Sequence, residues 1–273
     1  MTSGKSSLIL LIMILFLAAC SSGGASDHPT KTTAAPPTGE EILEQSISSM
    51  TDVPSFRMEK TEELNMESTT GYSQSTSESG WMIIETEPFA MHSRSVKDGE
   101  ENLMYIKDNY SYLHNPLKQT WNKADIASDE TASKNAELLK EPFKIQAEQM
   151  TNIADDIEVT ENDNNYVLKA TADASKAESV LEMISGISNA RLEENTQTEF
   201  ENFEYTISVD KDTQLPQHLM MDIAIKITDG AESTTVSIFS DVSYSDYGAT
   251  EKIALSEDAA NARDVTEERK TWY

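Results

Sequence analysis

The sequence predicts an α+β domain in which an antiparallel β-sheet is covered by helices on one side. Long stretches towards the C-terminus alternate apolar and polar residues, which is the pattern of strands with one buried face. Stretches with helical spacing lie before and between groups of strands instead of after each strand in turn. Without regular β–α alternation, a doubly wound parallel sheet is not expected.

The N-terminus predicts a secretory signal over residues 1–19. Lys5 precedes an apolar segment at residues 8–17, and small residues follow it up to Cys20. The apolar run is about ten residues long, shorter than the roughly 20 that cross a bilayer as a helix. An ordinary secretory signal, or a membrane helix with an incidental cysteine, is the alternative interpretation.

Residues 17–20, Leu-Ala-Ala-Cys, resemble the lipobox of bacterial lipoproteins. The resemblance implies that Cys20 carries diacylglycerol, with palmitate as a typical acyl chain, and becomes the first mature residue. The lipid would then hold the protein on the extracytoplasmic face of the cell membrane. Cys20 is the only cysteine of the chain, so lipidation leaves no thiol for a disulfide, a metal site or a nucleophile.

Residues 20–39 predict a lipidated cysteine followed by a flexible tether. The segment consists mainly of Ser, Thr, Gly, Ala and Pro, and it has almost no large apolar residues. A chain of this length and composition reaches about 25 Å on average. A domain at its end could stand away from a membrane and still return to it.

The charge of the chain is strongly negative. It has 21 basic and 48 acidic residues, a formal net charge of −27. Such a surface is repelled by nucleic-acid phosphates and anionic lipid headgroups, so no nucleic-acid partner is expected and membrane attachment has to come from the lipid. The acidity serves either a cationic partner or solubility in saline or alkaline surroundings.

The domain is expected to begin with a helix and to continue with strands. Thr38 and Glu41 have the spacing of a capping box, and Leu43, Ile47 and Met50 form one apolar stripe after it. Residues 55–121 then alternate in the manner of strands. Within them, residues 103–107 and 110–113 predict a hairpin around an Asp-Asn turn.

The middle of the chain predicts two short helices, a hairpin and a third helix. Pro142 interrupts the helical pattern of residues 130–151. Residues 157–159 and 166–170 flank a polar turn, Glu161 to Asn165, which fits a hairpin better than a calcium loop because the glycine and the glutamate of such a loop are missing. Residues 175–188 return to helical spacing.

Two strands near the C-terminus have the clearest alternation, and a third follows at residues 233–248. The apolar side chains of the first two are expected to point inward and to line the core or a ligand cavity. They are Phe203, Tyr205, Ile207, Val209, Leu219, Met221, Ile223, Ile225 and Ile227. The residues after Ala254 are acidic and are expected to be frayed or weakly helical, so that the domain spans residues 40–262 and a polar tail spans 263–273.

No catalytic or metal-binding pattern is present in the sequence. The four histidines, His28, His92, His114 and His218, have no ligand spacing, and Gly-x-Ser-x-Gly and glycine-rich nucleotide loops are absent. Ser208 and Lys211 match Ser-x-x-Lys, but on a strand they face opposite sides. We therefore expect no enzyme, no catalytic residue, no cofactor and no metal.

Three segments resemble the LolA/LppX/LprG-like lipoprotein superfamily, in its uncharacterised Gram-positive type. They are LMYIKDNYSYLHNPLKQTW (103–121), YTISVDKDTQLPQHLMMDI (205–223) and YSDYGATEKIALSEDAANA (244–262). The resemblance implies a strongly curved antiparallel sheet, a half-barrel, with helices on its concave side. Relatives carry lipids or lipid-modified proteins in the space between sheet and helices, but no binding residue can be transferred by name.

Several methionines lie on the apolar strand faces, among them Met58, Met82 and Met221, and such residues line either a cavity or an irregular core. The sequence favours a membrane-anchored, monomeric, non-enzymatic carrier or binding module for an apolar, lipid-like ligand or a lipoprotein partner. The alternative is an envelope interaction or sensor module with a solid core and no ligand cavity.

Overall fold

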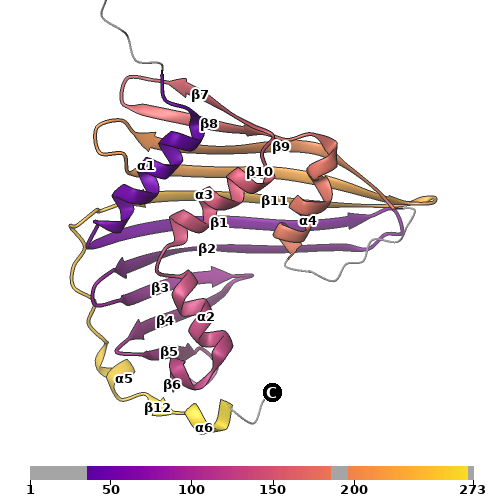
Figure 1. The fold of residues 1–273 in the computed structure, drawn as a ribbon. Helices are drawn as coiled ribbons and strands as arrows, with labels where there is room; N and C mark the ends of the chain where they lie inside the picture. Colours follow the sequence, from indigo (N-terminus) through magenta and orange to yellow (C-terminus); the bar gives the residue numbers. More distant parts are fainter. Residues whose placement is uncertain (1–35, 186–195, 270–273) are drawn as a thin grey trace, which may run out of the picture. The chain divides into compact units, whose positions relative to one another are not determined.

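The computed structural model describes residues 36–185 and 196–269, so Cys20 and most of the tether lie outside the described residues. Within that part of the chain, twelve strands form one unclosed sheet in the order β12-β6-β5-β4-β3-β2-β1-β11-β10-β9-β8-β7 (Figure 1). The strands are β1 (Ser55–Ser68), β2 (Ser73–Glu85), β3 (Ala90–Lys97), β4 (Glu100–Lys107), β5 (Tyr110–Asn115), β6 (Thr120–Asp125), β7 (Asp156–Glu161), β8 (Asn165–Thr171), β9 (Gln197–Asp210), β10 (Pro216–Asp229), β11 (Glu232–Ser245) and β12 (Arg263–Asp264).

Two antiparallel meanders make up the sheet, β1 to β6 and β7 to β11. The first and last of these strands, β1 and β11, pair with each other and join the meanders into one sheet. Among the strands of the described residues, only the short β12 is parallel to its neighbour, β6. The expected fold class is confirmed: an α+β domain with a curved, essentially antiparallel sheet and helices on its concave side.

The helices that cover the sheet lie on one face, which we call the inner face (Figure 1). They are α1 (Gly39–Thr51), α2 (Glu130–Leu138), α3 (Pro142–Ile153) and α4 (Ala177–Ser185), accompanied by the short turns η1 (Ile126–Ser128) and η2 (Ala174–Lys176). The expected capping box of α1 is confirmed, with Thr38 accepting from the Glu41 N–H and Glu41 accepting from the Thr38 N–H. The predicted last turn of the third helix, residues 186–188, lies outside the described residues.

The connection between the two meanders explains why α2 and α3 lie where they do. Ten strand spacings of about 4.8 Å, roughly 48 Å along the sheet, separate β6 from β7. The 9 residues of α2 and the 12 residues of α3 rise about 31 Å together, and the segments on either side of the helices span the rest of the distance. Pro142 separates the two helices, as predicted, because it suits the first position of a helix and not its interior.

Helix α3 is fixed to the sheet by hydrogen bonds as well as by apolar packing. The Tyr205 hydroxyl donates to the carbonyl oxygen of Gln146 at 2.8 Å, and the Tyr244 hydroxyl donates to Gln146 Oε1. Phe143 packs edge-on against Tyr244, with ring centroids 5.9 Å apart. Two strands that are not neighbours, β9 and β11, therefore bind the same residue of the crossover helix.

The C-terminal segment differs from the frayed tail that its acidic composition predicts. Ile253 and Ala259 are buried on the outer face of the sheet against Ala90, Tyr105 and Tyr112. The segment includes α5 (Glu257–Ala260), β12 and α6 (Thr266–Arg269). Of the two expectations for the residues after Ala254, the weakly helical one agrees with α5 and α6, and the frayed one does not, because Ala259 packs against a tyrosine-rich strand face.

Polar contacts hold the same segment at fixed points. The Ile253 N–H donates to Glu85 Oε1, and its carbonyl oxygen accepts from Lys107 Nζ, both at 2.5 Å. Further along, the Val265 N–H donates to the Lys123 carbonyl at 2.9 Å beside β12. The segment thus closes the second, smaller core and continues the sheet at the edge of β6.

Gly80 in β2 allows a close approach between neighbouring strands. A Cβ atom at this position would lie 2.2 Å from the backbone oxygen of Arg94 in β3. We expect Gly80→Ala to lower the free energy of unfolding by about 1–3 kcal/mol, because the strands would have to move apart. Chemical denaturation followed by circular dichroism measures this. Ser77→Ala, at an exposed position of the same strand, is the control, and equal stability of Gly80→Ala and wild type would contradict the close approach.

Candidate functional site

The nine apolar residues predicted to face inward share the inner face of β9 and β10. Their register brings them side by side, with Leu219 opposite Ile207 and Met221 opposite Tyr205. A register shift between Ala224 and Ile225 skips Glu201 of β9, so that Phe200 lies opposite Ile225 and packs against the same core. Six of the nine are at most 3% exposed, namely Tyr205, Ile207, Val209, Leu219, Ile223 and Ile225. Phe203, Met221 and Ile227 are partly buried and pack against the same core.

Side chains from the covering helices fill the space above these nine residues. Ile42 and Leu43 of α1, Phe143 and Met150 of α3 and Val180 of α4 are buried in the same apolar cluster. The six buried residues therefore present almost no surface to a ligand in this conformation. Ligand binding by the nine stays a prediction that would require the helices to move.

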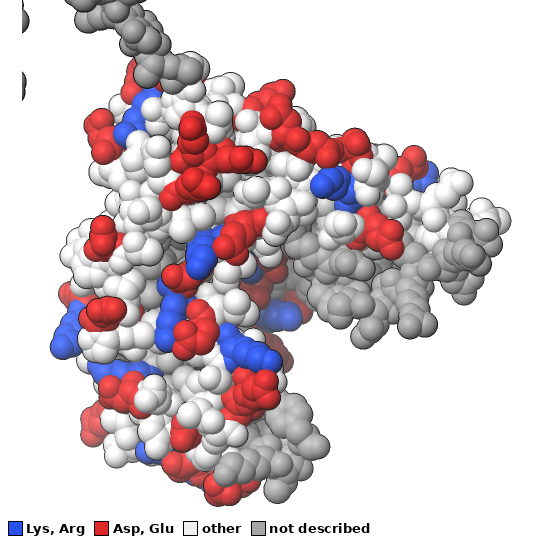
Figure 2. All heavy atoms as spheres, in the orientation of Figure 1, with Lys and Arg blue, Asp and Glu red and all other residues white. Residues whose placement is uncertain are grey.

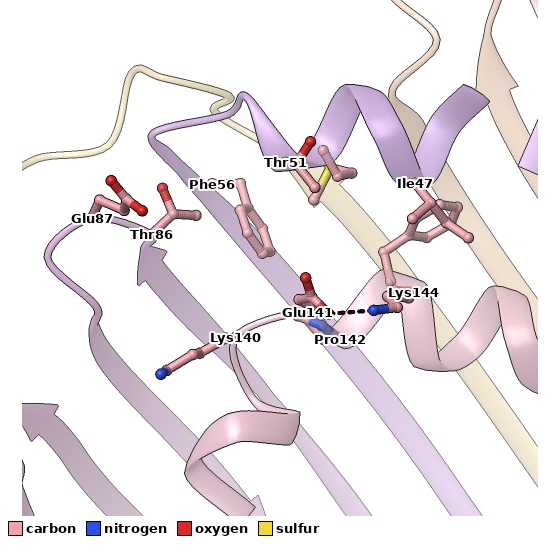
Figure 3. Close-up of a pocket in the computed structure, with 11 residues that line it drawn as sticks. Ile47, Thr51, Phe56, Thr86, Glu87, Lys140, Glu141, Pro142 and Lys144 are labelled. Carbon is pink, nitrogen blue, oxygen red and sulfur yellow. Dashed lines mark hydrogen bonds and ion pairs between the residues drawn. The ribbon is translucent and has the colours of Figure 1, made fainter. Parts of the chain in front are cut away.

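An open hollow lies at one end of this core, between α1, the start of β1, the β2–β3 turn and the junction of α2 with α3 (Figure 3). We call it the inner hollow, and its volume is about 280 Å³. It is lined by Ile47, Met50, Thr51, Phe56, Thr86, Glu87, Lys140, Glu141, Pro142, Phe143 and Lys144. This volume is slightly below the range of about 300–1,000 Å³ that is typical of small-molecule sites.

The walls of the inner hollow are positioned by the ends of secondary-structure elements. The Thr86 N–H donates to the Pro54 carbonyl at 3.0 Å, and the Thr86 hydroxyl donates to the Val53 carbonyl at 2.9 Å. These bonds hold the β2–β3 turn beside the link from α1 to β1. On the opposite side, the helix break at Pro142 directs the chain around the mouth of the hollow (Figure 3).

The inner hollow combines apolar side chains with charges of both signs. Ile47, Met50 and Phe56 supply apolar surface, whereas Lys140 and Lys144 supply ammonium groups. Lys144 pairs with Glu141 at 2.8 Å, and this hydrogen bond raises the pKa of Lys144, so the ammonium stays charged. Such a mixture suits a ligand with an apolar part and a small polar group.

A second hollow, of about 430 Å³, adjoins the first across Lys140. Lys140 lines both, pairs with Glu137 at 2.6 Å, and lies 5.5 Å from the ring centroid of Phe89. The second hollow is bounded by the β2–β3 turn, the β4–β5 turn and α2. The Lys140 side chain therefore forms the partition between two neighbouring hollows along the junction of α2 with α3.

The other sequence candidates are dispersed. His92 and His114 lie on the outer face, His218 pairs with Asp241 at 3.1 Å, and His28 lies outside the described residues. Within residues 36–185 and 196–269, no group of three or more His, Cys, Asp or Glu side chains could hold a metal ion. No described helix is long and apolar enough to cross a membrane.

The fold and the inner hollow define an α+β protein whose open antiparallel sheet is covered on one face and leaves a small amphipathic hollow at one end. The model of DUF6612, a family of unknown function, matches residues 38–264, and the chain belongs to this family. No curated protein matches the chain.

Three solved structures are similar to this chain at low identity and low TM-score. MucB in complex with MucA(peri) has 13% identity and a TM-score of 0.29; the match covers 80% of this chain and 57% of the MucB chain, little more than half of it. A LolA superfamily protein from Nitrosomonas europaea has 10% identity and a TM-score of 0.24, with 80% and 96% covered. A DUF1329 family protein from Desulfovibrio piger has 11% identity and a TM-score of 0.25, with 79% and 94% covered. These low scores carry no argument about the ligand or partner of this chain.

Sequence reasoning missed most residues of the inner hollow. They come from residues 47–56, 86–87 and 140–144, which share no motif and meet only in the folded chain. The one local signal was the helix break at Pro142 with lysines on both sides in a strongly acidic chain. That signal indicated a helix boundary, but it did not indicate which other segments lie beside this boundary in the folded chain.

The buried tyrosines predict a loss of stability at alkaline pH. Burial raises the pKa of Tyr205 and of Tyr244, whereas tyrosines of the unfolded chain ionise near pH 10. Their contribution is therefore fully present below about pH 10 and is lost as the pH rises further, because the unfolded state then binds fewer protons. Tyr205→Phe should make this decline less steep above about pH 10, as measured by urea unfolding. Tyr72→Phe, at a residue 53% exposed, should leave the slope unchanged, and equal slopes for all three proteins would contradict the assignment.

Proposed function

We propose that this chain is a non-enzymatic binding module that takes the apolar part of a lipid-like ligand, or of a lipid-modified partner, into the inner hollow. A lipid on Cys20 holds the module at the extracytoplasmic face of the cell membrane, and residues 21–39 act as its tether. The lipobox at residues 17–20 and the polar composition that follows support the anchor.

The inner hollow carries the proposal. Ile47 and Met50 are only partly buried, although they continue the apolar stripe of α1 whose earlier members are fully buried. These two residues form the end of the stripe. They lie beside Phe56 and Phe143 and line the opening of the inner hollow instead of being covered by another element. An acyl chain at this opening would remove further apolar surface from water, worth about 25 cal/mol per Å². Lys140 and Lys144 at the rim would attract an anionic headgroup.

Filling the hollow tests the proposal directly. The protein is produced without residues 1–20, extracted with organic solvent, and its copurifying lipid is identified by mass spectrometry; binding of a fluorescent fatty acid is then titrated. Met50→Trp should raise the Kd for this probe at least about tenfold, because the indole occupies the space of the acyl chain. Ser48→Trp, at an exposed position of the same helix, should bind as wild type does.

Two outcomes would overturn the ligand class. One is a protein that carries no lipid and takes up no fluorescent fatty acid. The other is equal binding by Met50→Trp and wild type, which would move the ligand elsewhere. Thermal unfolding of each variant distinguishes a loss of binding from a loss of folding.

The anchor is tested separately in a bacterial host that processes lipoproteins. We expect the full-length protein to sediment with membranes, and its N-terminal peptide to carry the mass of an acylated cysteine. The Cys20→Ala variant should lack the lipid modification, because no thioether can form without the thiol. An unmodified N-terminal cysteine in the wild type would contradict the lipoprotein assignment.

The packed core favours a second candidate, an envelope interaction or sensor module without a ligand cavity. Six of the nine inward residues are buried beneath helices, which leaves a solid core in the middle of the sheet. Acidic side chains are spread over the visible surface, while several basic ones gather where α2 meets α3 (Figure 2). Lipid-free protein that binds a cationic envelope component would favour this candidate.

A further inference from the structure

The outer face of the sheet carries a further hollow, chemically different from those of the inner face, which we call the outer-face hollow. Its volume is about 340 Å³, and it spans β11, β1 and β2. Its lining consists of Glu59, Lys60, Thr61, Ser79, Gly80, Trp81, Asp241 and Ser243. It contains one aromatic ring, two carboxylates and three hydroxyl groups.

Strand register explains why a hollow forms on this face. Glu59 lies opposite both Trp81 and Ser243, and Thr61 lies opposite both Ser79 and Asp241. The six side chains therefore occupy two rows on the same face of three adjacent strands. Because the Thr and Ser side chains are short, they form a low floor between the larger Trp81, Glu59 and Asp241.

The Trp81 ring is held in place before any ligand arrives. The Arg57 guanidinium lies 5.1 Å from the ring centroid, and His92 meets the ring edge-to-face at 4.8 Å and 88°. His92 in turn stacks on Tyr105 at 4.1 Å and 11°, and Tyr105 is buried beneath the C-terminal segment. This arrangement reduces the ordering that ligand binding would cost.

Each of the two carboxylates contacts one basic side chain. Arg57 pairs with Glu59 Oε1 at 2.9 Å, and His218 contacts Asp241 Oδ1 at 3.1 Å. Each of these contacts uses one oxygen, so the second oxygen of each carboxylate has no protein partner among the described residues. These oxygens can accept hydrogen bonds from a ligand.

We infer that the outer-face hollow binds a carbohydrate. A sugar ring packs its C–H face against Trp81, and its hydroxyl groups donate to Glu59 and Asp241 and exchange hydrogen bonds with Thr61, Ser79 and Ser243. This site lies on the opposite face of the sheet from the inner hollow, and it goes beyond the proposed function without depending on it.

The lining favours a sugar over two other ligand classes. A purely apolar ligand would remove Glu59 and Asp241 from water without giving them partners, which is costly. A quaternary ammonium ion would meet the Arg57 guanidinium beside the same ring and be repelled by its charge. A neutral ring with both C–H faces and hydroxyl groups satisfies the aromatic and the acceptors together.

Oligosaccharide titration of the protein without residues 1–20 tests the inference. The probes are cellotetraose and chitotetraose, followed by intrinsic tryptophan fluorescence and calorimetry. We expect at least one of them to bind saturably with a Kd in the millimolar range or below. Trp81→Ala should weaken binding at least about tenfold, Trp81→Phe less, and Asp241→Asn severalfold.

Matched controls lie on the same outer face beyond the hollow. Phe239→Ala and Asp222→Asn, at residues that lie opposite each other in β11 and β10, should bind as wild type does. Fatty-acid uptake should be the same in Trp81→Ala and wild type, so failure here is distinguishable from failure of the proposed function.

Three results would overturn the inference. They are no saturable binding of either oligosaccharide to the wild type, equal binding by Trp81→Ala and wild type, and displacement of the bound sugar by tetramethylammonium but not by sodium. The last result would identify a cation site. Circular dichroism of every variant separates altered binding from altered folding.

Discussion

The return of the chain across its own sheet is the constraint on which the rest of this structure depends. The first meander ends at β6 and the second begins at β7, and these two strands lie near opposite lateral edges of the joined sheet. The segment between them has to cross the inner face, and amphipathic helices are the conformation that satisfies their own backbone while covering an apolar surface. Gln146 fixes the crossing because Tyr205 and Tyr244 both donate to it. The packed core and the hollow at the helix break both follow from this path.

The two faces of the sheet serve different physical roles. The inner face is filled by helices over its central strands, and it opens into the inner hollow where α1 ends and α2 gives way to α3. The outer face remains polar near β1 and β11, but it becomes aromatic towards β4 and β6, where the C-terminal segment covers it. A single sheet therefore presents an amphipathic opening on one side and a polar, aromatic-walled hollow on the other.

Much of the fold could be predicted from local pattern. The capping box of Thr38 and Glu41, the turn at Asp108 and Asn109, and the break at Pro142 are decided by neighbouring residues, and all three are confirmed. The order of strands was not predictable in the same way, because the pairing of β1 with β11 joins residues far apart in the chain. The weak helices after Ala254 were predicted, but their packing was not, because the acidic composition reflects the exposed side of the segment, whereas Ala259 is buried against a strand face that is distant in the sequence.

The sequence by itself determined that the chain carries a lipobox-like segment, a polar tether and an acidic α+β domain, because these features depend on composition and on short-range periodicity. It also determined which faces of β9 and β10 are apolar. Only the tertiary structure decided that these faces are filled by helices, and that the open hollows lie elsewhere. The reason is that a hollow forms where the packed elements do not fill the space between them. Its walls come from residues near the ends of different elements, such as Ile47, Thr86 and Lys140, and no local sequence pattern shows that these residues lie close together.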